Sequence, residues 1–207
     1  MIHSKNFSLR AQALTKIFDK HCLFKDLNFS LETGESLAIT GPNGSGKSTL
    51  LQILSLYQSP SQGKIFWQAN KQNLPYEKIT NFLGFSSPLV NPYDDLTASE
   101  NIQLIIKKEK PQADLEKILE KFKLLKQKNL LIKKYSSGMK QRLKFILATI
   151  NQPPFLFLDE PGTNLDQEGK KIIYSALEEL KSKTILILAT NEKTEKNICQ
   201  EKIHLAD

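Results

Sequence analysis

The segment at residues 36–49, SLAITGPNGSGKST, decides the fold, because it joins a short apolar run to a glycine-rich loop that ends in Gly-Lys-Ser-Thr. The run SLAIT predicts a buried strand, and residues 48–57 after the loop predict a helix. Gly41, Gly44 and Gly46 let the backbone between them curl, so that successive N–H groups point at one anion. The segment therefore predicts a phosphate-binding loop between a strand and a helix.

This loop fits the P-loop motif G-x-x-x-x-G-K-[ST], which arises by chance in a chain of this length only about 1% of the time. A glycine-rich turn without function is the alternative, and the flanking strand and helix argue against it. Lys47 is expected to supply positive charge to the β- and γ-phosphates of a nucleotide, and the Ser48 hydroxyl to ligate Mg²⁺. The expected nucleotide-binding residues of the loop are Gly41, Pro42, Asn43, Gly44, Ser45, Gly46, Lys47, Ser48 and Thr49.

A second segment, FLFLDE at 155–160, ends an apolar run with two carboxylates. Asp159 is expected to hold Mg²⁺ through water, so that Ser48 and Asp159 form the metal site, and Glu160 is expected to polarise an attacking water. An apolar run that ends in Asp-Glu also occurs as an ordinary strand followed by a turn. The segment indicates chemistry only because a P-loop accompanies it.

The remaining pattern predicts an α/β core interrupted by helices. Apolar residues keep helical spacing from about 97 to 150, including a helix from Met139 to Ile150, and another helix is expected at 167–181. The expected strands lie at 7–18, 23–31, 36–40, 63–68, 82–86, 155–159, 184–190 and about 202–206.

Composition is that of a single globular domain, with 207 residues, 40% hydrophobic and 25% charged. No apolar run approaches the roughly 20 residues that a membrane span needs. The start of the sequence has no apolar signal segment. Cys22 and Cys199 have the spacing of neither a metal site nor a disulfide framework, so we expect a reducing cytoplasmic setting.

The formal net charge is +7, and ten lysines against four acidic residues fall between residues 107 and 134. One interpretation is a face turned toward anionic lipid or nucleic acid. Nucleic-acid-binding surfaces favour Arg and interleaved aromatic residues, whereas this stretch offers no Arg, only Phe122 and the adjacent Tyr135. We therefore favour a solvated helical face and expect no nucleic-acid partner.

The segment YSSGMKQR at 135–142 stands directly before a predicted helix. Two serines and a glycine at a helix start present hydroxyls, free N–H groups and the positive end of the helix dipole, which together favour an anion. A serine in that place is also an ordinary helix N-cap. Both interpretations stand on this segment alone.

Taken together, these motifs resemble the nucleotide-binding domain of ABC ATPases over nearly the whole chain. The likeness rests on GPNGSGKSTL, LTASEN (96–101), YSSGMKQR, FLFLDEPGTNLD (155–166) and the aromatic Phe18. It implies an α/β fold of the P-loop NTPase type. The single domain, 1–207, would comprise a RecA-like core at 1–86 and 153–207, an antiparallel β subdomain, and an inserted α-helical subdomain at about 87–152.

The resemblance also implies ATP and Mg²⁺ as ligands, with Phe18 stacked on adenine. Two such domains pack head to tail in this family, so Ser136, Ser137 and Gly138 would contact the ATP of a partner chain. Asp166, in the NLD that matches the D-loop of the family, would cross the same interface. The implied role is an ATPase subunit that powers a transporter. It would lie at the cytoplasmic face of the membrane, with a separate transmembrane permease and a second ABC ATPase domain, identical or different, as partners.

The sequence departs from the family pattern at three places. The usual signature is Leu-Ser-Gly-Gly-Gln, so Tyr135, Ser137 and Met139 differ from it. The usual Gln between core and helical insertion is missing, and its position falls near Ser87 or Pro88. The usual His after the last core strand is replaced by Asn191, whose amide can donate a hydrogen bond to phosphate but cannot become cationic. With Glu160 and Asn191 as the catalytic residues, we expect nucleotide binding to persist and hydrolysis to be slowed.

Three narrower expectations stay open. A weakly hydrolysing regulatory subunit with an active partner is an alternative, and so is a non-transport ABC ATPase. Translation factors of the family usually carry two domains per chain and repair members carry long coiled coils, and neither pattern occurs in this sequence. The permease is expected to dock around residues 84–101, and SSPLVNPYDDLTASEN (86–101) resembles exporter subunits, including the haem-exporter type of cytochrome c assembly.

Overall fold

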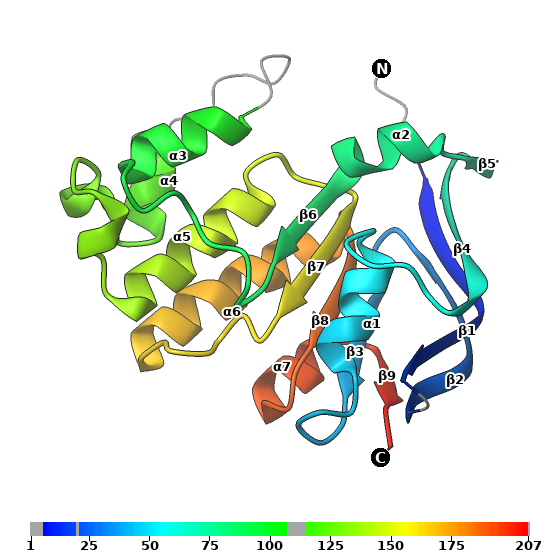
Figure 1. The fold of residues 1–207 in the computed structure, drawn as a ribbon. Helices are drawn as coiled ribbons and strands as arrows, with labels where there is room; N and C mark the ends of the chain where they lie inside the picture. Colours follow the sequence, from blue (N-terminus) through cyan, green and yellow to red (C-terminus); the bar gives the residue numbers. More distant parts are fainter. Residues whose placement is uncertain (1–5, 20, 107–114, 207) are drawn as a thin grey trace.

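The structure, a computed structural model, describes residues 6–19, 21–106 and 115–206. Its centre is a five-stranded parallel sheet in the order β6-β7-β8-β3-β9 (Figure 1). The strands are β3 (Ser36–Thr40), β6 (Leu83–Ser86), β7 (Phe155–Asp159), β8 (Ile185–Ala189) and β9 (Glu201–His204).

Both faces of this sheet are covered, so its central strands are mostly apolar rather than alternating. Every residue of β3, β7 and β8 is buried. Successive side chains still point to opposite faces, with Phe157 and Ile187 in one core cluster and Leu158 and Leu188 in the other. Because these strands are buried, their carboxyl ends, where the polar motifs begin, are held in fixed positions.

Helix α1 (Lys47–Leu54) lies between the parallel sheet and a second, antiparallel sheet in the order β2-β1-β4-β5. Leu50 and Leu54 of α1 share one core cluster with Leu9 and Trp67 of the antiparallel sheet. Helix α1, which follows the P-loop, is therefore packed between the two sheets. The antiparallel strands are β1 (Phe7–Phe18), β2 (His21–Glu32), β4 (Gln62–Ala69) and β5 (Gln72–Asn73).

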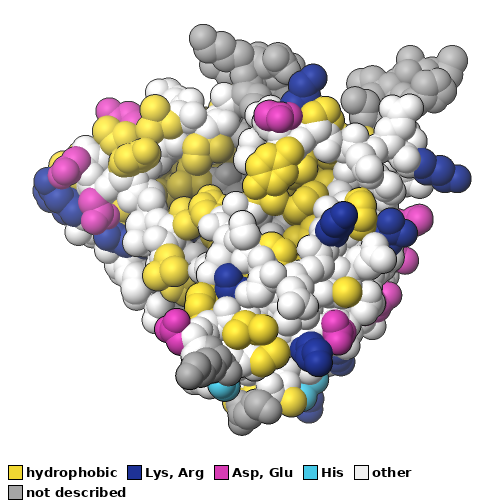
Figure 2. Space-filling view, turned by 45° about the vertical axis from the view of Figure 1, so that its right-hand side comes forward, with side chains coloured by type: hydrophobic (Ala, Val, Ile, Leu, Met, Phe, Trp, Pro, Cys, Tyr) yellow, Lys and Arg dark blue, Asp and Glu magenta, His cyan; other side chains and the backbone are white. Residues whose placement is uncertain are grey.

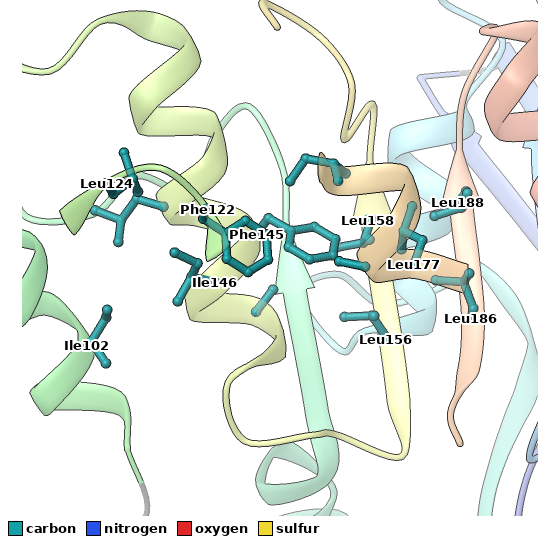
Figure 3. Close-up of a cluster of buried hydrophobic side chains, with 14 of the residues drawn as sticks. Ile102, Phe122, Leu124, Phe145, Ile146, Leu156, Leu158, Leu177, Leu186 and Leu188 are labelled. Atoms are coloured by element: carbon teal, nitrogen blue, oxygen red, sulfur yellow. The ribbon is translucent and has the colours of Figure 1, made fainter. Parts of the chain in front are cut away.

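The opposite face of the parallel sheet is covered by helices, and a cluster of buried hydrophobic side chains joins them (Figure 3). Phe122 and Phe145 lie at its centre, with ring centroids 5.6 Å apart. Leu156 and Leu186 extend the cluster to the sheet. The helices are α3 (Ala98–Ile105), α4 (Leu115–Lys121), α5 (Ser137–Thr149) and α6 (Gln167–Lys181).

Short elements complete the chain: α2 (Tyr76–Ile79), α7 (Lys193–Ile198) and the 3-10 turns Thr80–Phe82, Leu125–Gln127 and Ile132–Lys134. Among the residues described, no helix combines the length and the apolar character that crossing a membrane requires. The predicted α/β architecture is confirmed.

Two helix ends differ from the prediction. Helix α1 ends at Leu54 rather than Tyr57, and Leu56 takes a positive φ of 67° that breaks the helix. Helix α5 begins at Ser137 rather than Met139, because the Ser136 side chain caps it by accepting from Met139 N at 3.2 Å.

The lysine-rich stretch lies partly outside the described residues, which exclude Lys107, Lys108 and Lys110. Four of the lysines that are described pair with carboxylates at the surface. The pairs are Lys121–Glu179, Lys123–Glu168, Lys128–Glu116 and Lys133–Asp95. Such pairing is typical of a solvated face.

Candidate functional site

The P-loop follows β3 directly and leads into α1. Gly41 has φ 147°, and a Cβ there would lie 2.4 Å from the Leu205 carbonyl and 2.5 Å from Ser45 Oγ, so only glycine fits. Gly46, with φ 95°, is the N-cap of α1. Lys47 Nζ donates to the carbonyls of Gly41 and Pro42, both at 2.8 Å, which places its charge inside the curl of the loop.

The loop fits a phosphate group. Ser45 Oγ is buried and, within the described residues, has no hydrogen-bond partner. A buried hydroxyl without a partner is costly, so a phosphate oxygen is a natural complement to it. Beside it, Gly44 has φ 92° and open space where a Cβ would stand. The predicted phosphate site is thus a preformed cradle with one unsatisfied polar atom.

Asp159 ends β7 and meets Ser48 of α1 across the site. The carboxyl is buried, and burial raises its pKa above the ordinary value, while a hydrogen bond from Ser48 and the charge of Lys47 act in the opposite direction. A hydroxyl and a carboxylate are the oxygen donors that Mg²⁺ prefers. The residues at the predicted metal site therefore suit this ion.

Glu160 is held in an uncommon backbone conformation, with φ 47°. Its N–H donates to the Ala189 carbonyl at 2.9 Å, and its Oε2 accepts from the Thr163 hydroxyl at 3.0 Å. The carboxylate is therefore held at the carboxyl end of β7, directly after Asp159.

Asn191 follows β8, the strand that lies between β7 and β3. Its Oδ1 accepts from the backbone N–H of Gly41 at 3.4 Å. The amide nitrogen of the same side chain is then the group that remains as a donor. The structure thus brings the replacement for the usual His to the P-loop itself.

The position of the missing Gln lies at the end of β6. Ser86 pairs in register with Leu158, so Ser87 follows beside Asp159. Ser87 Oγ accepts from Leu89 N at 3.2 Å, and Lys144 Nζ donates to the carbonyls of Ser87 and Pro88 at 3.3 Å each. The loop after β6 is therefore held in place by Lys144 of α5.

Phe18 ends β1 with 43% of its surface exposed, and Lys16 Nζ lies 4.6 Å from its ring centroid. A cation on one face fixes the ring and leaves the other face for stacking. The neighbouring strand β2 contacts the P-loop, because a Cβ on Gly46 would lie 3.2 Å from Leu23 Cβ.

The signature segment lies away from the P-loop of its own chain. Figure 1 shows the start of α5 and the loop before α1 on different sides of the molecule. Ser136 and Ser137 are exposed, whereas Tyr135 is buried and donates to the Gln127 carbonyl at 2.9 Å. Met139 packs against the same core. Of the three residues that differ from the usual signature, Tyr135 and Met139 thus point into the core.

Asp166 caps α6 by accepting from Gly169 N at 2.7 Å, and it is exposed. Two residues of this region were not predicted from the sequence. Gln141 of α5 and Glu195 of α7 both bond the backbone between Glu160 and Asp166. Gln141 lies in the segment YSSGMKQR, but no role was assigned to it, and no motif marks Glu195.

A groove of about 610 Å³ opens on another face, between β6, α3 and α5. Its lining includes Tyr57, Phe85, Tyr93, Leu104 and Lys144. The first two stack, with ring centroids 4.5 Å apart, while Tyr57, Tyr93 and Leu104 stay more than 60% exposed. Figure 2 shows hydrophobic side chains gathered in the upper half of the face that it displays.

Comparison with known proteins adds sequence relatives to this geometry. Residues 24–163 match the sequence family described as "ABC transporter". The chain is 34% identical over 195 residues to the ABC transporter ATP-binding protein YxdL of Bacillus subtilis (strain 168), covering 88% of this chain and 76% of the relative. It is 34% identical to the lipoprotein-releasing system ATP-binding protein LolD of Treponema denticola, covering 87% of each.

Among solved structures, the chain superposes on a cassette described as the dimeric post-hydrolysis state of MJ0796 bound to ADP and Pi. The TM-score is 0.81 with 26% sequence identity, and the match covers 95% of this chain and 94% of that one. The dimeric structure of MJ0796 as a bacterial ABC transporter cassette matches with a TM-score of 0.79, also at 26% identity, and covers 96% and 94%.

Proposed function

This chain belongs to the ABC transporter family of ATP-binding proteins, and we propose that it hydrolyses ATP to power a membrane transporter. The observation that carries the proposal is the convergence of the P-loop, Asp159, Glu160 and Asn191 at one end of the parallel sheet. The P-loop follows β3, Asp159 and Glu160 lie at the end of β7, and Asn191 follows β8. The likeness to ATP-binding subunits over most of the chain supports the same function.

The side chains divide the work of hydrolysis. Lys47 and the N–H groups of the loop bind and orient the phosphates. Ser48 and Asp159 would hold Mg²⁺, which supplies charge neutralisation on the phosphates when bound. Glu160 orients the attacking water and takes its proton, and Asn191 donates to the phosphate oxygen as negative charge grows there. The buried strands keep these groups from shifting during the reaction.

A second ABC domain would complete the site. In Figure 1 the start of α5 lies at the left and the loop before α1 at the lower centre. The hydroxyls of Ser136 and Ser137 and the helix start favour an anion. We infer that they contact the ATP of the partner chain, with Asp166 at the same interface. The γ-phosphate then bridges two surfaces, and its loss on hydrolysis weakens their association.

The groove beside α3 is the place where we infer that a transmembrane permease docks. It spans part of the predicted docking segment 84–101, and its exposed Tyr93 and Leu104 suit an apolar partner helix. Docking there would hold the chain at the cytoplasmic face of the membrane as a peripheral subunit. Assignment to the haem-exporter type is a narrower proposal, which rests only on the sequence of residues 86–101.

One observation favours a slow enzyme, or a regulatory subunit with an active partner. Ser87 and Asn191 stand where the family usually has Gln and His. Ser87 Oγ is already engaged with the backbone N–H of Leu89, and Asn191 cannot become cationic. Loss of one donor to developing charge typically costs about 10²–10³ in rate.

The test is ATP hydrolysis by the chain isolated with its partners from membranes. Wild type should release phosphate, whereas Glu160→Gln should bind ATP without hydrolysis and Lys47→Ala should lose affinity for ATP. Identifying the copurified proteins tests the transporter role and the haem-exporter assignment together. Absence of ATP hydrolysis, or copurification with no membrane protein, would contradict the proposal.

A further inference from the structure

The turn from Glu160 to Asp166 is held from two sides by side chains to which the sequence analysis gave no role. On one side, Gln141 Nε2 donates to the carbonyls of Glu160 at 3.3 Å and Pro161 at 3.1 Å. Gln141 lies in α5, the helix that begins at the signature serine. These two bonds tie that helix to the backbone of the general base.

The same helix meets the turn a second time through its first residues. A Cβ on Gly138 would lie 3.1 Å from the Asn164 carbonyl, so the helix start packs closely on the far end of the turn. The contact of Gln141 with the turn is therefore supported by a second contact between the same helix and the turn. Because α5 is continuous from Ser137 to Thr149, a displacement at Ser136 moves the Gln141 amide with it.

The other side of the turn is fixed by Glu195 of α7. Its Oε1 accepts from Gly162 N at 2.8 Å and from the Tyr174 hydroxyl at 3.2 Å. A Cβ on Gly162 would lie 2.5 Å from the Tyr174 hydroxyl and 2.6 Å from Glu195 Oε1, which leaves no room for the turn to slide that way. With this side immobile, movement of α5 is transmitted to the carbonyls of Glu160 and Pro161.

We propose that Gln141 is a positioning residue that couples the two nucleotide sites of an assembled pair. The inference rests on the proposed function, in which Ser136 touches the ATP of the partner while Glu160 acts on the ATP of its own chain. Gln141 is the direct hydrogen-bond link between those two elements within one chain. Binding of ATP against the signature segment would thereby set the backbone of Glu160 at the other site.

The test compares side chains of similar reach that keep or lose the donor. Gln141→Glu matches the size of the amide but has no N–H to offer the two carbonyls. Gln141→Lys restores a donor, as Lys144 shows one turn later by bonding the carbonyls of Ser87 and Pro88. Gln103→Ala, on the exposed face of α3, is the matched control.

We expect Gln141→Glu to lower kcat about fivefold or more and to move the Hill coefficient for ATP toward 1. Gln141→Lys and Gln103→Ala should stay close to wild type. ADP affinity should be unchanged in all variants, since a merely structural role would alter it. The proposal is overturned if Gln141→Glu hydrolyses ATP like wild type, if Gln141→Lys is equally impaired, or if Gln141→Glu lowers ADP affinity in step with kcat. A wild-type chain without ATP hydrolysis would instead contradict the proposed function.

Discussion

The backbone N–H of Gly41 donates to Oδ1 of Asn191 at 3.4 Å, so the first glycine of the P-loop is hydrogen-bonded to the second residue after β8. This contact orients the amide and leaves its nitrogen as the donor for phosphate. The family's usual His would offer a ring nitrogen at the same place. The contact supports the proposal that Asn191 takes part in hydrolysis.

Replacing Asn191 by Ala removes both the contact with Gly41 and the donor. We expect kcat to fall by about 10²–10³, with a smaller change in the KM for ATP, because the donor acts on charge that develops in the transition state. Asn191→His should raise kcat above wild type. Steady-state phosphate release measures both variants, with Asn197→Ala on exposed α7 as control. A kcat for Asn191→Ala equal to wild type would refute this role.

Phe18 provides a separate prediction, for recognition of the base. Phe18→Leu removes the ring that Lys16 holds in place, and stacking of a base on an aromatic ring is worth about 1–3 kcal/mol. The affinity for ATP should fall accordingly, while the affinity for inorganic tripolyphosphate, which has no base, should not change. Calorimetric titration with the two ligands separates these outcomes. Equal losses of affinity for ATP and for tripolyphosphate would show that Phe18 supports the P-loop rather than binding adenine.

Asp166 has two candidate roles that substitution can separate. Asp166 is the N-cap of α6. Asp166→Ala should therefore lower the free energy of unfolding of the protein by about 1 kcal/mol, whereas Asp166→Asn should keep the cap. If its charge also acts at the interface between two copies, Asp166→Asn will lower ATPase activity without lowering stability. Urea unfolding and hydrolysis assays on the same samples give the comparison. Full ATPase activity of Asp166→Asn would mean that Asp166 acts only as the N-cap of α6.

Glu195 predicts a pH dependence of stability. Burial raises the pKa of its carboxyl above the ordinary value of 4.5, and the nearby Glu192 acts in the same direction. The folded protein therefore keeps this proton at pH values at which the unfolded chain has released it. The free energy of unfolding contributed by this group falls as pH rises through that range. Neighbouring Tyr174 and Cys199 also have raised pKa values, that of Cys199 to about 12, so they stay neutral across this range.

Glu195→Gln keeps the oxygen that accepts from Gly162 and Tyr174 but cannot titrate. Its stability should therefore decline less than that of wild type between pH 4.5 and neutrality. Glu195→Ala should be less stable than either at every pH, since it leaves two buried donors without an acceptor. Parallel pH profiles of wild type and Glu195→Gln would count against a raised pKa.

The sequence predicted best where one local pattern fixes both backbone and chemistry. The P-loop and its flanks follow from the spacing of Gly41, Gly46 and Lys47 alone. Helix α6 begins and ends as predicted, at 167 and 181, because an Asp cap precedes an amphipathic run. Asp159 was found because an apolar run that ends in a carboxylate occurs in the same chain as a P-loop. These parts needed no tertiary information.

Long-range contacts left no such signal. Gln141 lies in the segment YSSGMKQR but was given no role, because its two carbonyl partners lie about twenty residues further along the chain. Helix α7 is only six residues long, too short for a periodic pattern, so Glu195 was not recognised as a buried carboxyl. The start of α5 was placed two residues late because Gly138 suggested a loop, whereas its small size serves the approach to Asn164.

The central claim is that the signature segment of one chain closes over the nucleotide of another. Crosslinking between Ser136→Cys and Asn43→Cys tests it, in a chain that also carries Glu160→Gln and in which Cys22 and Cys199 are replaced by Ser. Oxidation in the presence of ATP should give a covalent species of twice the chain mass, and omission of ATP should abolish it. A chain that stays at single mass with ATP bound would contradict the account.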